Sequence, residues 1–310
     1  PMKLTPAERK AKLAESIAKH PLLHKRLVPQ TAKRDSLVRL NRNIEAGIKT
    51  KQALSLPILR ANDEKAKTLW GNVLFDNSWG AETPEYGMYS FSTETPIKVK
   101  KQFLDDFFRA TGAGAWIEDD LYFVMHQNFW GVDVIYLYHY DTKTWEKKLE
   151  KRLENYSLVA IETAVANDGT VYGCFLDADG TYNELGVVDY ATESRTTIGR
   201  LRHSYVAMGI TSDNVLYGIA EDGNLYKIDT QTAEEVVVGS TGKQLTKADG
   251  SYFYQSGEID QTTNTFYWDC VDNNQQSTLY TVNLTTGQLT EVGQFANNNI
   301  VSLLTIPKAK

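Results

Sequence analysis

A short polar turn follows an aromatic-rich strand five times along this chain. The strand before the turn ends at an equivalent residue each time, namely Ser92, Asp141, Asp189, Asp229 and Asn283. These anchor residues are 49, 48, 40 and 54 positions apart. Repeats of roughly 40–50 residues are typical of propellers and stacked arrays, in which one unit of several strands is copied and packed against its neighbours. The spacing therefore predicts a repeat architecture, which by itself specifies no activity.

Each repeat divides into four strands, which we call a to d in chain order. The first repeat shows strands b, c and d at residues 69–74, 86–91 and 97–103, but it has no strand a. Residues 300–306 form an apolar strand with no b, c or d after it. This last strand can complete the first repeat and leave no open edge where the ring closes. We therefore predict an all-β fold with an N-terminal helical segment: a β-propeller of five four-stranded blades closed by the C-terminal strand. The alternative is that the last strand opens a further blade.

The N-terminal segment differs in charge from the rest of the chain. Residues 1–52 hold 13 Lys and Arg against four Asp and Glu, a balance of +9, so the other 258 residues carry −15 to give −6 in total. Thr5 to Glu8 forms a helix-capping box, and Leu37, Leu40, Ile44 and Ile48 form an apolar stripe at helical spacing. We predict a basic segment of two short helices at residues 1–52, a linker at 53–66 and the propeller at 67–310.

The same charges and the hydropathy bear on partners. An acidic main body argues against nucleic acid as a partner, because phosphate binding needs a basic surface. No apolar run approaches the roughly 18 residues of a membrane-spanning helix, so no membrane span is expected.

The stretch Leu216 to Thr230 and the turn Asp260 to Tyr267 carry a resemblance to known repeats. They resemble β-propellers of the YncE, NHL and quinoprotein-like type, and the turn is similar to those of secreted and surface proteins of Bacteroides-type bacteria. The resemblance covers roughly residues 67–306, and the uneven repeat length departs from the NHL pattern. It implies an exported protein, extracellular, at the cell surface or periplasmic, and often one domain of a longer surface chain. The chain begins at Pro1 without an apolar leader, so we expect a targeting segment to have been removed.

Two b–c loops carry a copied motif on the face where propellers usually bind ligands. Asn77 and Trp79 in the first repeat match Asn128 and Trp130 in the second, 51 residues further on. Flat aromatic rings beside side-chain amides suit sugar rings and peptides. These four residues are therefore our predicted ligand-binding residues. The alternative interpretation is that each Trp packs under its own blade and the Asn only shapes the turn.

Glu162, Glu258 and Asp260 lie where strand a should line the central axis. Paired carboxylates at roughly 5–9 Å are the requirement for a glycosidase. The five histidines show no metal-ligand spacing, and no catalytic motif is present. We predict no catalytic residue, metal or cofactor. The leading hypothesis is an exported, non-catalytic binding or adhesion module for a glycan or protein on the b–c and d–a loops. The alternatives are a glycoside hydrolase or lyase with axial carboxylates, and a structural spacer of a surface protein.

Overall fold

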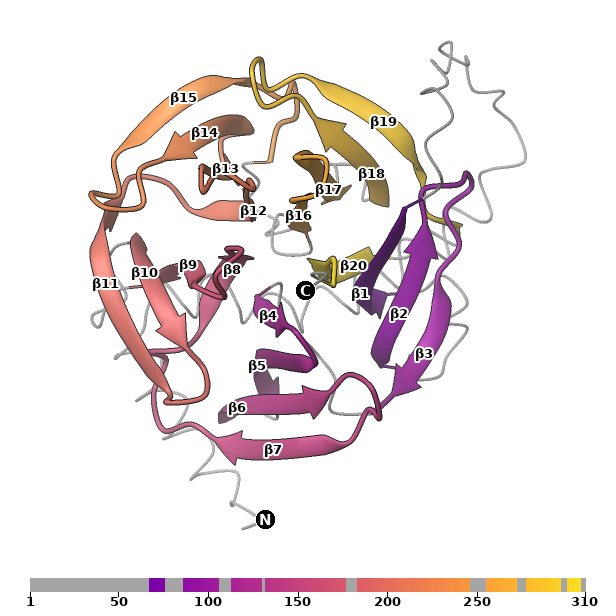
Figure 1. The fold of residues 1–310 in the computed structure, drawn as a ribbon, viewed down its shortest axis with the longest axis vertical. Coiled ribbons are helices and arrows are strands. Elements are labelled where there is room, and N and C mark those ends of the chain that lie inside the picture. Colours follow the sequence, from indigo (N-terminus) through magenta and orange to yellow (C-terminus); the bar gives the residue numbers. More distant parts are fainter. Residues whose placement is uncertain are drawn as a thin grey trace.

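The computed structural model describes residues 67–75, 86–105, 113–129, 132–176, 183–245, 255–271, 277–296 and 300–307. The predicted helical segment and linker, residues 1–66, lie outside these ranges. The described residues form twenty β-strands and no α-helix, arranged as five four-stranded antiparallel sheets around a central axis (Figure 1). Among them, no helix is long and apolar enough to cross a membrane.

The four strands of each blade follow one another from the axis outward. Blade 1 contains β20 (Ile300–Thr305), β1 (Thr68–Phe75), β2 (Gly87–Ser92) and β3 (Lys100–Leu104). Blade 2 contains β4 (Gly114–Ile117), β5 (Asp120–Phe129), β6 (Val132–Asp141) and β7 (Lys147–Arg152), and blade 3 contains β8 (Ala160–Val165), β9 (Val171–Leu176), β10 (Asn183–Asp189) and β11 (Ser194–Leu201). Blade 4 contains β12 (Tyr205–Ile210), β13 (Leu216–Ala220), β14 (Asn224–Ile228) and β15 (Glu235–Ser240), and blade 5 contains β16 (Ser256–Asp260), β17 (Thr265–Val271), β18 (Ser277–Val282) and β19 (Leu289–Gln294).

The C-terminal strand closes the ring, as the sequence predicted. Strand β20 pairs antiparallel with β1, with Trp70 opposite Thr305 and Val73 opposite Val301. It also contacts the innermost strand of blade 5, where the amide of Leu304 donates to Ser256 Oγ at 2.8 Å. The five-blade prediction is therefore confirmed, and each end of the propeller region is held by the other.

The anchor residues shape the turn between strands c and d. In blades 2 to 5 the anchor Oδ1 accepts the amides two and three residues later, as Asp229 does from Gln231 and Thr232, both at 2.8 Å. The fifth residue of each of these turns has positive φ, for example Ala233 at 61° and Gly287 at 77°. The repeated Asp or Asn is thus the turn-forming residue, because its short side chain bonds its own following backbone.

We expect Asp229→Ala to lower the free energy of unfolding, because it leaves two turn amides without their acceptor. Asp229→Asn should leave stability close to that of the wild type, since Asn keeps the Oδ1 acceptor, as Asn283 does in blade 5. Urea unfolding of the two variants measures both effects. Equal losses in both would show that the charge, and not the acceptor, matters.

Three outer strands share a glycine that the repeat pattern alone did not predict. Gly199, Gly239 and Gly293 each lie ten residues after their anchors, Asp189, Asp229 and Asn283. Each packs against the c–d turn of the next blade. A Cβ on Gly239, for example, would lie 2.1 Å from the carbonyl oxygen of Thr286. The glycines therefore let neighbouring blades approach closely at the outer edge of the ring.

One predicted strand begins later than expected. Strand d of blade 1 was predicted at residues 97–103, but β3 spans Lys100–Leu104. Ile97 instead forms a parallel bridge with Phe295, next to β19. Its amide donates to the carbonyl of Gln294 and its carbonyl accepts from Ala296, so its backbone is used by blade 5 and not by β2.

Because neighbouring strands are antiparallel, the b–c and d–a connections of every blade lie on one face of the ring and the a–b and c–d connections on the other. We call these the b–c/d–a face and the a–b/c–d face. Aromatic side chains fill the space between blades, as where Phe103 of blade 1 stacks on Trp145 of blade 2 at 5.3 Å between ring centroids. The packed interfaces fix the connections of neighbouring blades relative to one another.

Candidate functional site

The predicted aromatic loops fall largely outside the described residues. Asn77, Trp79 and Trp130 lie in undescribed connections. Asn128 is in β5, where it pairs with Asp133, and its side chain is not described. A ligand role for these four residues therefore stays a prediction.

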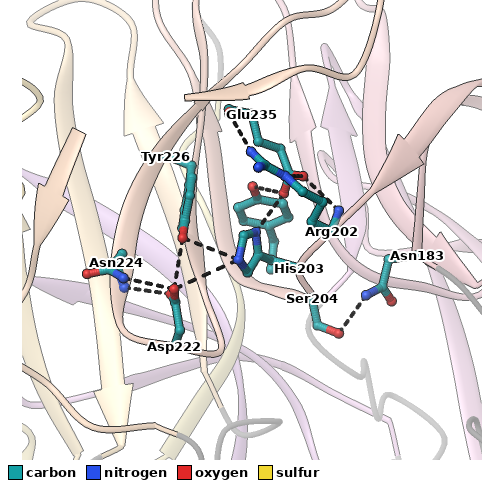
Figure 2. A network of polar contacts seen from close by, with 9 residues as sticks. Asn183, Arg202, His203, Ser204, Asp222, Asn224, Tyr226 and Glu235 are labelled. Carbon is teal, nitrogen blue, oxygen red and sulfur yellow. Dashed lines mark hydrogen bonds and ion pairs between the residues drawn. The ribbon is translucent and has the colours of Figure 1, made fainter. Parts of the chain in front are cut away.

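The b–c/d–a face is described where blade 3 meets blade 4. Arg202, His203 and Ser204 form the d–a connection between β11 and β12, and Asp222 opens the b–c turn between β13 and β14 (Figure 2). Asp222 shapes this turn by accepting the Asn224 amide at 2.9 Å. The two connections lie beside each other and join through side chains.

Tyr226 and His203 connect the two loops. The Tyr226 hydroxyl donates to Asp222 Oδ2 at 2.8 Å and lies 3.3 Å from His203 Nε2 (Figure 2). Asn224 Nδ2 donates to the same Asp222 oxygen at 2.8 Å. The other imidazole nitrogen, His203 Nδ1, is 3.0 Å from Glu235 Oε1. Both ring nitrogens are engaged, so the imidazole is fixed in position.

Glu235 is the buried centre of the network. Its side chain is 1% exposed, and it accepts from the Arg202 amide at 2.7 Å, from Arg202 Nε at 3.1 Å and from the Tyr205 hydroxyl at 2.6 Å. Burial raises the pKa of Glu235, but the hydrogen bonds from Tyr205, Arg202 and His203 outweigh it and lower the pKa below its usual value. The carboxylate is therefore ionised and binds Arg202 and His203 of the d–a connection together with Tyr205, the first residue of β12.

The outer atoms of this network remain accessible to a ligand. The side chain of Arg202 is 68% exposed, that of Asp222 32% and that of His203 23%. The buried Glu235 thus holds a cation and an imidazole at the surface, and Tyr226 and Asn224 hold the Asp222 carboxylate beside them. Such an arrangement can bind hydroxyl, amide or carboxylate groups at little entropic cost. No sequence pattern indicates it, because the d–a connection and Glu235 are more than 30 residues apart.

Two of the predicted axial carboxylates are buried at the centre of the ring. Glu162 is 2% exposed and Glu258 5%. Each accepts the amide of the next residue, Thr163 or Ile259, at 3.0 Å. Burial raises the pKa of Glu162 well above its usual value, and the charge of Glu258 adds to the effect. The Ser256 hydroxyl acts in the opposite direction. Glu162 belongs to blade 3, whereas Ser256 and Glu258 belong to blade 5. The Glu162 carboxyl therefore interacts with a non-adjacent blade across the central axis.

The third axial candidate has a separate environment. Asp260 forms an ion pair with Lys67 at 2.7 Å, and its pKa is lowered because this pairing and the Thr262 contacts outweigh burial. Next to it, Gln261 Nε2 donates to the carbonyls of Val165 and Ile210 at 2.9 and 3.0 Å, across the end of the inner strands. Asp260 therefore lies on the a–b/c–d face of the ring, where it is ion-paired with Lys67.

Sequence reasoning also missed a buried acid in β17. Asp269 is 0% exposed, accepts the Ser277 hydroxyl at 2.8 Å and accepts the Val301 amide of β20 at 3.0 Å. Burial raises its pKa to about 8, although both hydrogen bonds act to lower it. The sequence did contain a signal. Asp269 is an acid at a position of strand b that is occupied by Cys174 in blade 3 and by Ile219 in blade 4.

We expect the stability of the wild type relative to Asp269→Asn to fall as pH rises. A carboxyl whose pKa is raised in the folded state binds its proton more tightly there, so folding loses stability as pH rises from about 4 to about 8. Asn carries no proton to lose. The difference in unfolding free energy should therefore change by up to about 5 kcal/mol in favour of the variant over that range. Urea unfolding at pH 5 and pH 8.5 measures it, and a difference that does not vary with pH would contradict the raised pKa.

Among the described residues, no group of three or more His, Cys, Asp or Glu side chains is arranged to hold a metal ion. Cys174 and Cys270 are both buried and are not joined by a disulfide.

The ring of five four-stranded blades defines the protein as a β-propeller. No family model matches the chain, and no curated protein matches it. Among solved structures it is similar to TolB from Acinetobacter baumannii (12% identity, TM-score 0.45, 73% of this chain and 53% of that one) and to Kuenenia stuttgartiensis hydrazine synthase (16% identity, TM-score 0.37, 64% and 53%). It is also similar to a quinoprotein alcohol dehydrogenase-like protein from Bacteroides thetaiotaomicron (12% identity, TM-score 0.39, 71% and 56%). The chain thus spans about half the length of these structures, and likenesses at this level assign no activity.

Proposed function

We propose that the protein is an exported, non-catalytic binding module that recognises a glycan or protein ligand on its b–c/d–a face. The observation that carries the proposal is the exposed, pre-positioned set of Arg202, His203 and Asp222. Glu235 holds Arg202 and His203 from below, and Tyr226 and Asn224 hold Asp222. Ligands with several hydroxyl, amide or carboxylate groups need donors and acceptors held in place, which this cluster supplies. Export rests on the resemblance of the repeats to YncE, NHL and quinoprotein-like propellers of Bacteroides-type surface proteins, which also favours a module of a longer surface chain.

The axial carboxyls support a binding role over a hydrolytic one. Glu162 and Glu258 are almost completely buried, and each bonds the amide that follows it. A glycosidase needs two acids that flank a substrate bond with room for a sugar ring between them. Asp260 is paired with Lys67, and the described lining of the cavity beside it includes neither Glu162 nor Glu258.

A glycan array probed with the labelled full chain tests the proposal, together with Arg202→Ala and His203→Ala. Wild type should bind at least one glycan class, and both variants should weaken that signal about fivefold or more, as loss of a charged or well-placed hydrogen-bond partner does. Lys143→Ala is the matched control, because Lys143 is an equally exposed cation (70%) on the a–b/c–d face. Equal loss in the control and the site variants would contradict the proposal. If the ligand is a protein, the same wild-type, site-variant and control chains are compared on a protein array.

The copied Trp loops extend the proposed face to blades 1 and 2. If Trp79 and Trp130 contact the ligand, Trp79→Ala and Trp130→Ala should lose binding while their melting temperatures stay within a few degrees of wild type. If the rings pack under their blades, both variants should melt well below wild type.

A further inference from the structure

A second candidate site lies on the opposite face, between blades 2 and 3. A cavity of about 290 Å³ opens there beside the a–b and c–d turns of blade 3. Its lining includes Ile117 and Tyr122 of blade 2, and Asp168, Val171, Asp189 and Tyr190 of blade 3. This volume is at the small end of ligand pockets, which suits one side chain or a compact ligand.

An aromatic wall forms one side of this cavity. Tyr122 stacks on His139, with ring centroids 4.2 Å apart and planes at 14°, and Asp120 Oδ1 lies 2.6 Å from His139 Nε2. Tyr190 lies nearly parallel to Tyr122, at 6.0 Å and 12°. Tyr190 is 3% exposed, and its hydroxyl has no hydrogen-bond partner in the described part of the chain. The wall therefore consists of two nearly parallel tyrosine rings, and the Tyr122 ring is held in place by its stacking on His139.

The charge at the cavity is negative. Asp168 and Asp189 are exposed at its rim, and the described residues that line it include no Lys, Arg or His. The pKa of Asp189 is lowered because Thr192 and the Ala191 amide hydrogen-bond to it, so the carboxyl is ionised. Both amides bond Oδ1, and the Thr192 side chain also hydrogen-bonds the carboxylate, which is nevertheless exposed. The pKa of Tyr122 is raised by burial first and then by the charges of Asp120 and Asp189, so the negative field reaches the ring.

We propose that this cavity binds an organic cation of about the size of an arginine side chain. The cation would sit against the Tyr122 ring, where cation–π attraction acts, and would pair with the exposed Asp189 carboxylate. The site is on the other face from the proposed ligand surface, so it stands or falls independently of the proposed function.

Isothermal titration of the full chain with N-acetyl-arginine amide tests this site. The turn chemistry supplies a matched pair of variants. Asp189→Asn removes the charge but keeps the Oδ1 acceptor, as Asn283 does in the same turn of blade 5. Asp229→Asn makes the same change in blade 4, away from the cavity. Asp189→Asn should weaken binding about fivefold or more, Tyr122→Leu similarly, and Asp229→Asn less than twofold.

Two further probes define the chemistry. N-acetyl-citrulline amide, the neutral counterpart, should not bind detectably. Tetramethylammonium binding with the same dependence on Tyr122 would support a general cation site, and binding of the arginine probe alone would support guanidinium recognition. The proposal is overturned if the arginine probe shows no saturable binding, or if Asp189→Asn and Asp229→Asn, both with wild-type melting temperatures, bind it equally.

Discussion

A chain that ends at residue 299 should not fold to a propeller with one frayed edge; it should lose cooperative unfolding altogether. Strand β20 is the innermost strand of blade 1 and carries Val301, Leu303 and Leu304, which are 0–3% exposed. Burying each such side chain contributes about 1.5–3 kcal/mol. Together with the β20–β1 pairing and the Asp269–Val301 bond, this approaches the whole stability of a typical domain, about 5–15 kcal/mol.

Circular dichroism and urea unfolding of the truncated chain measure the effect. A synthetic peptide of residues 299–307 added in trans should restore part of the cooperative transition, because it supplies the strand that the truncated chain lacks. The single change Leu304→Ala gives a graded comparison and should cost about 2–5 kcal/mol. A truncated chain that unfolds cooperatively at the wild-type midpoint would show that β20 does not close the ring.

Glu235→Ala is expected to cost about 2–4 kcal/mol of unfolding free energy, because it removes the acceptor of a fully buried hydroxyl and of a charged side chain. Tyr205 is 0% exposed and its hydroxyl donates to Glu235 at 2.6 Å. Glu235→Gln keeps an oxygen acceptor and should lose less. Glu234→Ala, an exposed neighbour, is the matched control and should stay within about 0.5 kcal/mol of wild type.

The difference in stability between the wild type and Glu235→Gln should depend on pH with a defined sign. The pKa of Glu235 is lowered in the folded state, so its stabilisation is present above its unfolded pKa and is lost as pH falls through the folded value. The difference between wild type and Glu235→Gln should therefore be largest near pH 7 and shrink below about pH 4. A difference that grows on acidification would contradict an ionised Glu235.

Repeat spacing and turn chemistry predicted the scaffold because both can be read directly from the order of residues along the chain. An Asp or Asn that bonds its own following amides is visible within four residues, and an unmatched first and last strand have one way to leave no open edge. Ile97 was assigned to the wrong strand because its backbone partner, Phe295, is supplied by the last complete blade and not by the neighbouring strand in sequence.

The candidate sites were less predictable, because they form between blades. His203 meets Glu235 and Tyr226 only because a d–a connection, strand β14 and the outer strand β15 converge where blade 3 meets blade 4. Nothing in the local pattern distinguishes these residues from ordinary surface groups. The axial acids were found because strand a is recognisable, but their burial depends on how five inner strands pack around one axis.

Hydrogen–deuterium exchange of the full chain, with and without the glycan or protein that gives the strongest array signal, would locate the bound ligand on one face of the ring. We predict that the ligand slows exchange in peptides that cover residues 202–204 and 222–226, on the b–c/d–a face, and leaves the c–d turns at 142–146 and 229–234 unchanged. Protection confined to those c–d turns would place the ligand on the opposite face and contradict the proposed binding site.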